Sequence, residues 1–189
     1  MATVFIIHGA YGNPQENWFL WLKKELENLG HTVIVPQFPT PENQTLENWM
    51  KIFSRYENNI HEDTIMIGHG VGVAFILGFL SQKEQHIKAA FFIAGFFEPL
   101  ENPAFDTLNN TFINKPFDWK KIRQHSKRFF VYHADNDPYV PLKHGEALAK
   151  KLHVKLILVK NAGHFNTRSG YTQFPELLED AKKSLWRFN

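Results

Sequence analysis

Two short polar segments of the chain carry side chains that could transfer a proton, and each follows directly after an apolar run. Asp137 lies in residues 134–141 (ADNDPYVP), and His164 lies in residues 161–165 (NAGHF). A carboxylate on a proline-stiffened turn is suited to orient an imidazole, which can then act as a general base. We therefore expect Asp137 to orient His164, with Asp135 as the alternative acid.

A third segment, residues 65–72 (IMIGHGVG), runs from β-branched residues into a glycine-rich turn. Gly68 and Gly72 stand two positions on either side of residue 70. In this Gly-x-x-x-Gly frame many hydrolases hold a nucleophilic serine on a strained strand-to-helix turn. Position 70 is glycine in this chain. The frame therefore predicts ester-cleaving chemistry at a site whose attacking hydroxyl is missing.

Backbone N–H groups beside this turn could stabilise the negative charge that develops on a carbonyl oxygen under attack. Residues 8–12 (HGAYG) follow the first apolar run, and we expect the N–H of Ala10 or Tyr11 to be one donor of an oxyanion hole. The N–H of Val71, at the start of the next helical stretch, would be the second donor. The same pocket is also expected to be lined by His8, Gly9 and His69.

Two other chemistries fit the spacing of these motifs less well. A dinucleotide-binding loop needs G-x-G-x-x-G after the first strand, whereas the glycines here follow the third apolar run as G-x-G-x-G. A metal site at Asp135 and Asp137 lacks the calcium-loop pattern, and Pro138 interrupts it. We expect no cofactor and no metal, although one option stays open, a metal-assisted hydrolase built on His8, His69 and His164.

Short apolar runs alternate with amphipathic stretches along the chain, and their near-continuous apolarity is typical of strands buried on both faces of a parallel sheet. Six strands are expected, at residues 4–7, 32–35, 64–67, 89–93, 129–132 and 155–159. Helical patterns lie between them, at residues 14–29, 45–58, 71–81, 119–125, 143–151 and 174–186. This alternation predicts one α/β domain over residues 1–189 with right-handed crossovers. The carboxyl ends of parallel strands meet at one edge, which brings the polar segments together.

Residues 96–117 break this alternation, because they contain three prolines and several asparagines. The segment is too long for an ordinary connection, and we expect a loop that covers the pocket with aromatic side chains facing the substrate. The side chains expected there are Phe96, Phe97 and Phe112. The alternative is a surface loop that its phenylalanines pin to the core.

The composition excludes several classes of partner. A formal net charge of +2 without a basic stripe gives no reason to expect nucleic acid. The chain has no cysteine, which excludes disulfides and thiolate metal sites and favours a reducing compartment. It enters an apolar strand at once, and no apolar run approaches the ~20 residues of a membrane span. We expect a cytoplasmic protein that does not bind membranes.

Over nearly its whole length the chain resembles the small α/β-hydrolases of the retinoblastoma-binding protein 9 type, a group of compact serine hydrolases. The resemblance is carried by residues 5–9 (FIIHG), 67–69 (IGH), 135–141 (DNDPYVP) and 162–165 (AGHF). It implies the α/β-hydrolase fold, a three-layer αβα sandwich around a six-stranded parallel sheet in the order 2-1-3-4-5-6. It also implies hydrolysis of small acyl or ester substrates without a cofactor, by a nucleophile at position 70, the acid Asp137 and the base His164.

The chain departs from this family at one decisive point, because Gly70 has no side chain where a serine is expected. Three explanations stay open: the serine was replaced to silence the enzyme, the protein is a natural pseudoenzyme that kept its pocket, or a different chemistry operates. The first two predict an inactive or very weakly active chain. The alternative function is a non-catalytic protein that binds a small ligand or a protein partner in the same pocket.

Overall fold

A six-stranded parallel sheet forms the centre of the molecule. The computed structural model describes residues 1–186. In this sheet the order is β2-β1-β3-β4-β5-β6, and every neighbouring pair is parallel. The predicted number, direction and order of the strands are confirmed. The strands are β1 (Thr3–Ile7), β2 (Thr32–Ile34), β3 (Ile65–His69), β4 (Ala89–Ile93), β5 (Phe129–Ala134) and β6 (Leu156–Val159).

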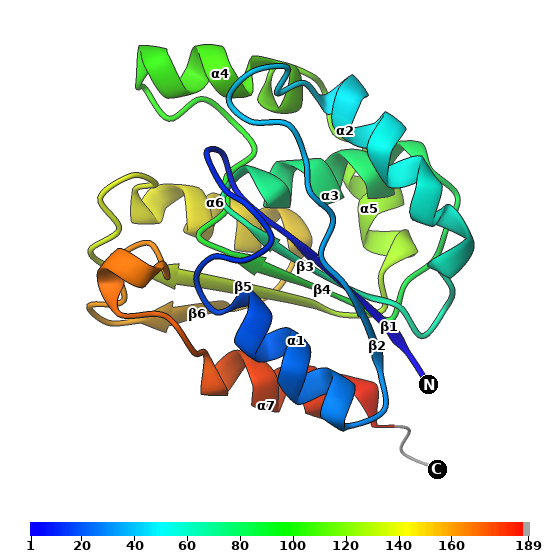
Figure 1. Cartoon of the computed structure of the whole chain (residues 1–189). Coiled ribbons are helices and arrows are strands. Elements are labelled where there is room, and N and C mark those ends of the chain that lie inside the picture. The colour runs from blue at the N-terminus through cyan, green and yellow to red at the C-terminus, as the bar shows by residue number, and fades with distance from the viewer. Residues whose placement is uncertain (187–189) are drawn as a thin grey trace.

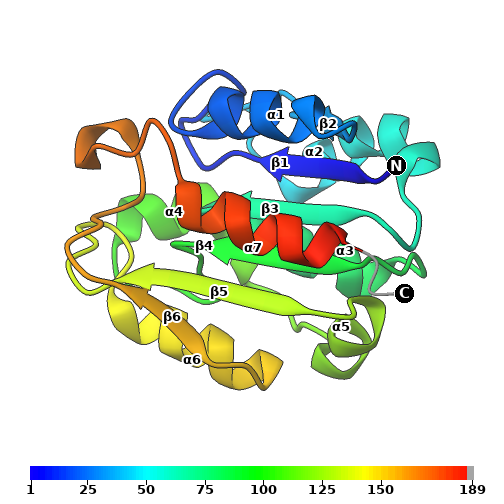
Figure 2. The ribbon, with the colours of Figure 1, turned by 90° about the horizontal axis from the view of Figure 1, so that it is seen from below.

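Helices cover both faces of the sheet, which makes three layers (Figure 1, Figure 2). One face carries α1 (Phe19–Asn28) and α7 (Pro175–Leu185). The other face carries α2 (Leu46–Phe53), α3 (Val71–Gln82), α5 (Trp119–His125) and α6 (Leu142–Leu152), with α4 (Pro103–Ile113) above α3. Two 3-10 helices, η1 (Ser54–Asn59) and η2 (Thr167–Ser169), also occur among the described residues. No helix formed by residues 1–186 is long and apolar enough to span a membrane.

The side chains of β1 show how both faces of the sheet are buried. Val4 and Ile6 pack in the layer of α1 and α7, whereas Phe5 and Ile7 pack in the layer of α2 and α3. α3 is apolar on every side and is buried over residues 71–80, as expected of a helix in the core. This packing fixes the N-terminus of α3 at the carboxyl edge of β3.

The ends of several elements differ from the sequence prediction. β3 runs on through His69, so the strand leads directly into the glycine-rich turn. The first helix begins only at Phe19, and the residues before it form turns. The helix predicted over residues 45–58 starts where expected, at the N-cap Thr45, but changes to 3-10 geometry at Ser54.

The expectation of a loop over residues 96–117 is wrong in its centre, where α4 forms. The side-chain oxygen of Asn102 caps this helix by accepting the Phe105 N–H over 3.4 Å. Pro103 occupies the first turn, where the N–H that proline lacks would have no partner in any case. The Asn-Pro pair is therefore a helix start here, and not only a loop signal.

Candidate active site

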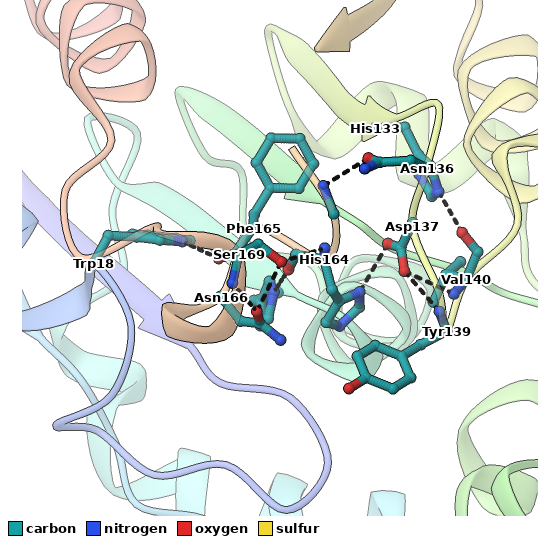
Figure 3. Close-up of polar contacts among 12 residues, drawn as sticks. Trp18, His133, Asn136, Asp137, Tyr139, Val140, His164, Phe165, Asn166 and Ser169 are labelled. Atoms are coloured by element: carbon teal, nitrogen blue, oxygen red, sulfur yellow. Dashed lines mark hydrogen bonds and ion pairs between the residues drawn. The ribbon is translucent and has the colours of Figure 1, made fainter. Parts of the chain in front are cut away.

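Asp137 and His164 meet at the carboxyl edge of the sheet, on the loops that follow β5 and β6 (Figure 3). The Nδ1–H of His164 donates to Asp137 Oδ2 over 2.8 Å. The other carboxylate oxygen accepts the N–H groups of Tyr139 (2.9 Å) and Val140 (3.0 Å). Because an ionised carboxylate can only accept hydrogen bonds, Nδ1 of His164 carries a proton, and in the neutral imidazole Nε2 is then the acceptor nitrogen.

The pKa of Asp137 lies below its ordinary value. Burial raises the pKa of this carboxyl, but the hydrogen bond and charge of His164, together with the two backbone N–H groups, outweigh the effect of burial. The side chain of Asp137 is fully buried. The carboxylate therefore stays ionised at neutral pH and can stabilise a positive charge that develops on His164.

Hydrogen bonds between the two loops hold this pair in place. Asp135, the alternative acid, accepts the N–H of Asn161 over 2.8 Å. The Asn136 side-chain oxygen accepts the N–H of Gly163 over 2.8 Å. Asp135 therefore binds the backbone of the histidine loop, while Asp137 binds the imidazole.

Gly70 forms the turn between β3 and α3 with φ +56° and ψ −123°, angles that only glycine adopts without strain. A Cβ atom placed on Gly70 would stand 3.6 Å from His164 Nε2 and 3.7 Å from Gly9 Cα, which is ordinary contact. A hydroxyl on that carbon would be within hydrogen-bond reach of the free ring nitrogen. Gly72 differs, because its Cβ would stand 2.5 Å from the Ile7 carbonyl oxygen. The turn thus has room for a side chain at position 70 and none at position 72.

Two backbone N–H groups beside Gly70, those of Ala10 and Val71, have no acceptor within residues 1–186. Val71 is the first residue of α3, where N–H groups have no partner inside the helix. Tyr11, the other donor predicted on the first loop, is committed elsewhere, because its N–H donates to Thr40 Oγ1 over 2.7 Å. Of the two donors predicted on this loop, Ala10 is the one whose N–H remains available.

A cavity of about 580 Å³ opens over Gly70 and His164, which is a suitable size for a small organic ligand. Ala10, Gly70, Val71 and His164 therefore line one partly open cavity. Among the residues predicted to form the site, its wall contains Gly9, Ala10, Tyr11, His69, Gly70, Val71, Phe96 and His164.

Two phenylalanines predicted for the cavity wall lie elsewhere. Phe97 packs against Trp119, with ring centroids 4.9 Å apart. Phe112 is fully buried against Trp49, at 5.0 Å. The reason is that residues 103–113 form a helix, which turns the Phe112 ring toward the core and away from the cavity.

Two histidines near the cavity are buried and structural. His8, also predicted for the wall, instead accepts the Phe38 N–H at Nε2 (3.0 Å) and donates from Nδ1 to the Gly9 carbonyl (2.8 Å). His69 donates from Nε2 to the carbonyl oxygen of His164 (2.8 Å). Burial, followed by the charge of His164, lowers the pKa of His69 to about 3. Within residues 1–186 no group of three or more His, Cys, Asp or Glu side chains is arranged to hold a metal ion.

Sequence reasoning missed much of the remaining cavity wall. Tyr139 stands edge-on to the His164 ring at 5.2 Å, and its place beside Asp137 in the chain was the available signal. Glu16 was hidden inside a predicted helix, but the late start of α1 leaves it at the cavity. Burial raises the pKa of Glu16, while the Asn13 N–H and the charge of His164 act in the opposite direction. The missed residues are Glu16, Asn17, Leu100, Phe105, Asn109, Tyr139, Val140, Asn166, Thr167 and Arg168.

A protein-family model described as "Serine hydrolase" matches residues 4–182. Among curated proteins, YdeN of Bacillus subtilis (strain 168) is 32% identical over 174 residues, which cover 91% of this chain and 90% of YdeN. The serine hydrolase RBBP9 of Rattus norvegicus is 24% identical over 186 residues, which cover 97% of this chain and 95% of that protein.

Solved structures show the same fold. The crystal structure of the B. subtilis ydeN gene product matches with a TM-score of 0.90 at 30% identity, covering 97% of this chain and 98% of that one. Est1E from Butyrivibrio proteoclasticus, solved with bound ferulic acid, matches with a TM-score of 0.73 at 17% identity, covering 97% and 87%. At that identity the likeness to Est1E concerns the fold alone.

Proposed function

The chain belongs to the serine hydrolase family, and on this basis we propose that its cavity is built to hydrolyse carboxylic esters of small acyl groups. One observation carries the proposal. His164 Nε2, in a ring oriented by Asp137, stands 3.6 Å from the place that a Cβ on Gly70 would occupy. This geometry suits a serine hydroxyl, and the chain has none there. The protein has the fold and the cavity of a hydrolase, but the position of the nucleophile holds a glycine.

With a serine at position 70 the chemistry would follow the acyl-transfer mechanism of catalytic triads. The hydroxyl attacks the ester carbonyl while His164 Nε2 takes its proton, and Asp137 stabilises the imidazolium. The N–H groups of Ala10 and Val71 hold the negative oxygen of the tetrahedral intermediate. His164 then protonates the leaving alcohol, and a water molecule that it deprotonates releases the acid.

The glycine-containing chain retains a weaker route. His164 can activate a water molecule near Gly70, with the same two N–H groups stabilising the oxyanion. In enzymes that lose a member of the triad, the oxyanion hole and substrate binding alone leave ~10³–10⁴-fold acceleration over water. We expect weak hydrolysis of activated esters at best.

Gly70 itself also favours a second function, in which the same cavity binds a small ligand without turnover. The cavity of about 580 Å³ is complete without a nucleophile, so loss of the hydroxyl does not remove the binding site. The two functions share the cavity and differ only in whether chemistry follows binding.

The Gly70→Ser variant separates the two functions. We expect its hydrolysis of p-nitrophenyl acetate and butyrate to exceed that of the unmodified chain by at least ~10³-fold, a conservative bound beside the ~10⁶-fold lost when such a nucleophile is removed. Gly70→Ala is the matched control, because it adds the same backbone strain without a hydroxyl. Combining Gly70→Ser with His164→Ala should return the rate to that of the control.

A folded Gly70→Ser variant that is no faster than Gly70→Ala would contradict the hydrolase proposal. Saturable binding of a non-hydrolysable acyl ligand by that inactive variant would then support the binding function. Circular dichroism of each variant establishes that the comparison is made between folded proteins.

A further inference from the structure

A chain of four hydrogen bonds connects helix α4 to the loop that carries the Ala10 N–H. It begins at the Tyr11 N–H, which donates to the Thr40 hydroxyl oxygen (2.7 Å). Thr40 donates to Gln44 Oε1 (2.5 Å), and Gln44 Nε2 donates to Asn109 Oδ1 (2.8 Å). Asn109 Nδ2 then donates to the Phe105 carbonyl oxygen on α4 (2.8 Å). Gln44 and Asn109 are buried.

The direction of every bond in this chain is fixed from the α4 end. The Phe105 carbonyl can only accept, so the amide of Asn109 must present Nδ2 to it and Oδ1 to Gln44. Gln44 must then donate to Asn109, which leaves its Oε1 to accept the hydroxyl proton of Thr40. With its proton used, Thr40 presents a lone pair to the Tyr11 N–H. Each polar group therefore orients the next.

The loop after β1, at the other end of this hydrogen-bond chain, has a strained residue that the bond to Thr40 can hold in place. Tyr11 has φ +57°, a left-handed angle that costs a bulky residue conformational energy. Tyr11 as a whole is 63% exposed, so it contributes little burial to offset that cost. The bond to Thr40 is made by the peptide N–H directly after Ala10, so it constrains the orientation of the residue whose N–H faces no acceptor.

We propose that Thr40 is a positioning residue of the active site, which holds the Ala10 N–H in place through Tyr11 and is itself oriented by Gln44 and Asn109. The inference rests on the proposed hydrolase function. Asn109 and Phe105 also line the cavity. The wall that contacts the ligand and the loop that stabilises the oxyanion are thus parts of one polar network.

Steady-state kinetics of Thr40→Val in the Gly70→Ser protein test this role. Valine keeps the shape of threonine and removes the hydroxyl. We expect kcat to fall roughly tenfold, less than the ~10²–10³-fold lost when an oxyanion donor itself is removed, while KM changes less than about twofold. Thr40→Ser keeps the hydroxyl and should restore kcat to within about twofold of the parent.

Thr111→Val is the matched control. The Thr111 hydroxyl accepts the N–H of Leu46 over 3.0 Å, so the control loses a threonine-to-backbone bond of the same kind away from the oxyanion loop. A loss of kcat in Thr40→Val no larger than in Thr111→Val would overturn the proposal. So would a rise in KM at unchanged kcat, because Thr40 would then shape only binding.

Amide hydrogen exchange on the unmodified Gly70 chain tests the same role without activity. The Tyr11 N–H should exchange faster in Thr40→Val than in Thr111→Val, and equal rates would overturn the positioning role. If Gly70→Ser is inactive while Tyr11 exchange responds to Thr40→Val, the hydrolase function fails and the hydrogen-bond network stands.

Discussion

At Gly70 the backbone conformation disfavours a side chain, although the surrounding atoms leave space for one. Its φ of +56° strains any side chain, yet a Cβ there would meet nothing closer than 3.6 Å. Gly72 shows the opposite case, because its Cβ would stand 2.5 Å from a backbone carbonyl that cannot move aside. A side chain at position 70 is therefore disfavoured by backbone conformation alone, at a cost of ~1–3 kcal/mol.

Gly70→Ala and Gly70→Ser should each lower the free energy of unfolding by about 1–3 kcal/mol, the energy of a strained non-glycine conformation. Gly72→Ala should lower it by more, because strand and helix must separate to admit the methyl group. Urea denaturation of the three variants gives the comparison. Equal losses at positions 70 and 72 would show that crowding at Gly72 adds nothing to the loss, and would contradict this comparison.

Residue types and spacing alone predict the Asp137–His164 pair, since both polar segments follow strands that end at the same edge. The sequence favours Asp137 over Asp135 only through the neighbouring Pro138, and it leaves the choice between Ala10 and Tyr11 open. Each choice depends on which neighbouring group takes a hydrogen bond, and that is set by loops from distant parts of the chain.

Helix α4 shows the same limit at the scale of an element. Prolines and asparagines in residues 96–117 suggested a loop, but Asn102 and Pro103 are the cap and first turn of a helix. Asp106 ties the residues before α4 to the helix, because its carboxylate accepts the N–H groups of Leu100 (2.7 Å) and Asn102 (3.0 Å). Local sequence was ambiguous between a loop and a capped helix, and contact with α2 and α3 favours the helix.

Asp106→Ala should lower the free energy of unfolding by about 1.5–3 kcal/mol, the range for hydrogen bonds to a charged group. It should also speed amide exchange in α4. Asn110→Ala is the control on the same helix, because Asn110 is exposed and, within residues 1–186, its side chain bonds only to that of Asn114. A loss for Asp106→Ala no greater than for Asn110→Ala would refute the anchoring role.

Buried histidines make the stability of the whole fold depend on pH. The positions of the strands follow from their apolar runs and their order from the family resemblance. Which of the ten histidines are buried does not follow from either, because that depends on how loops and helices cover the sheet. Burial is the largest influence that lowers the pKa of His8, His69, His133 and His144. The unfolded chain therefore binds protons that the folded protein excludes.

His69 makes the clearest prediction, since its pKa falls from 6.5 to about 3 on folding. Above pH 6.5 both states hold it neutral, and it contributes no pH dependence. Below that, the unfolded state is protonated first, so stability is lost as the pH falls toward 3, by about 1.4 kcal/mol per pH unit for this one group. His69→Gln should flatten the slope of unfolding free energy between pH 6 and 4 by that amount relative to the unmodified chain. An unchanged slope in His69→Gln would show that its burial is not coupled to folding.

Intact-mass spectrometry after treatment with a fluorophosphonate tests the central claim most directly, since this reagent reports a serine hydroxyl activated by an oriented histidine. The Gly70→Ser variant should gain one phosphonyl group, mapped by peptide sequencing to residue 70. Neither the unmodified chain nor Gly70→Ser combined with His164→Ala should react. Absence of labelling in a folded Gly70→Ser protein would mean that Asp137 and His164 do not serve position 70, and would contradict the account.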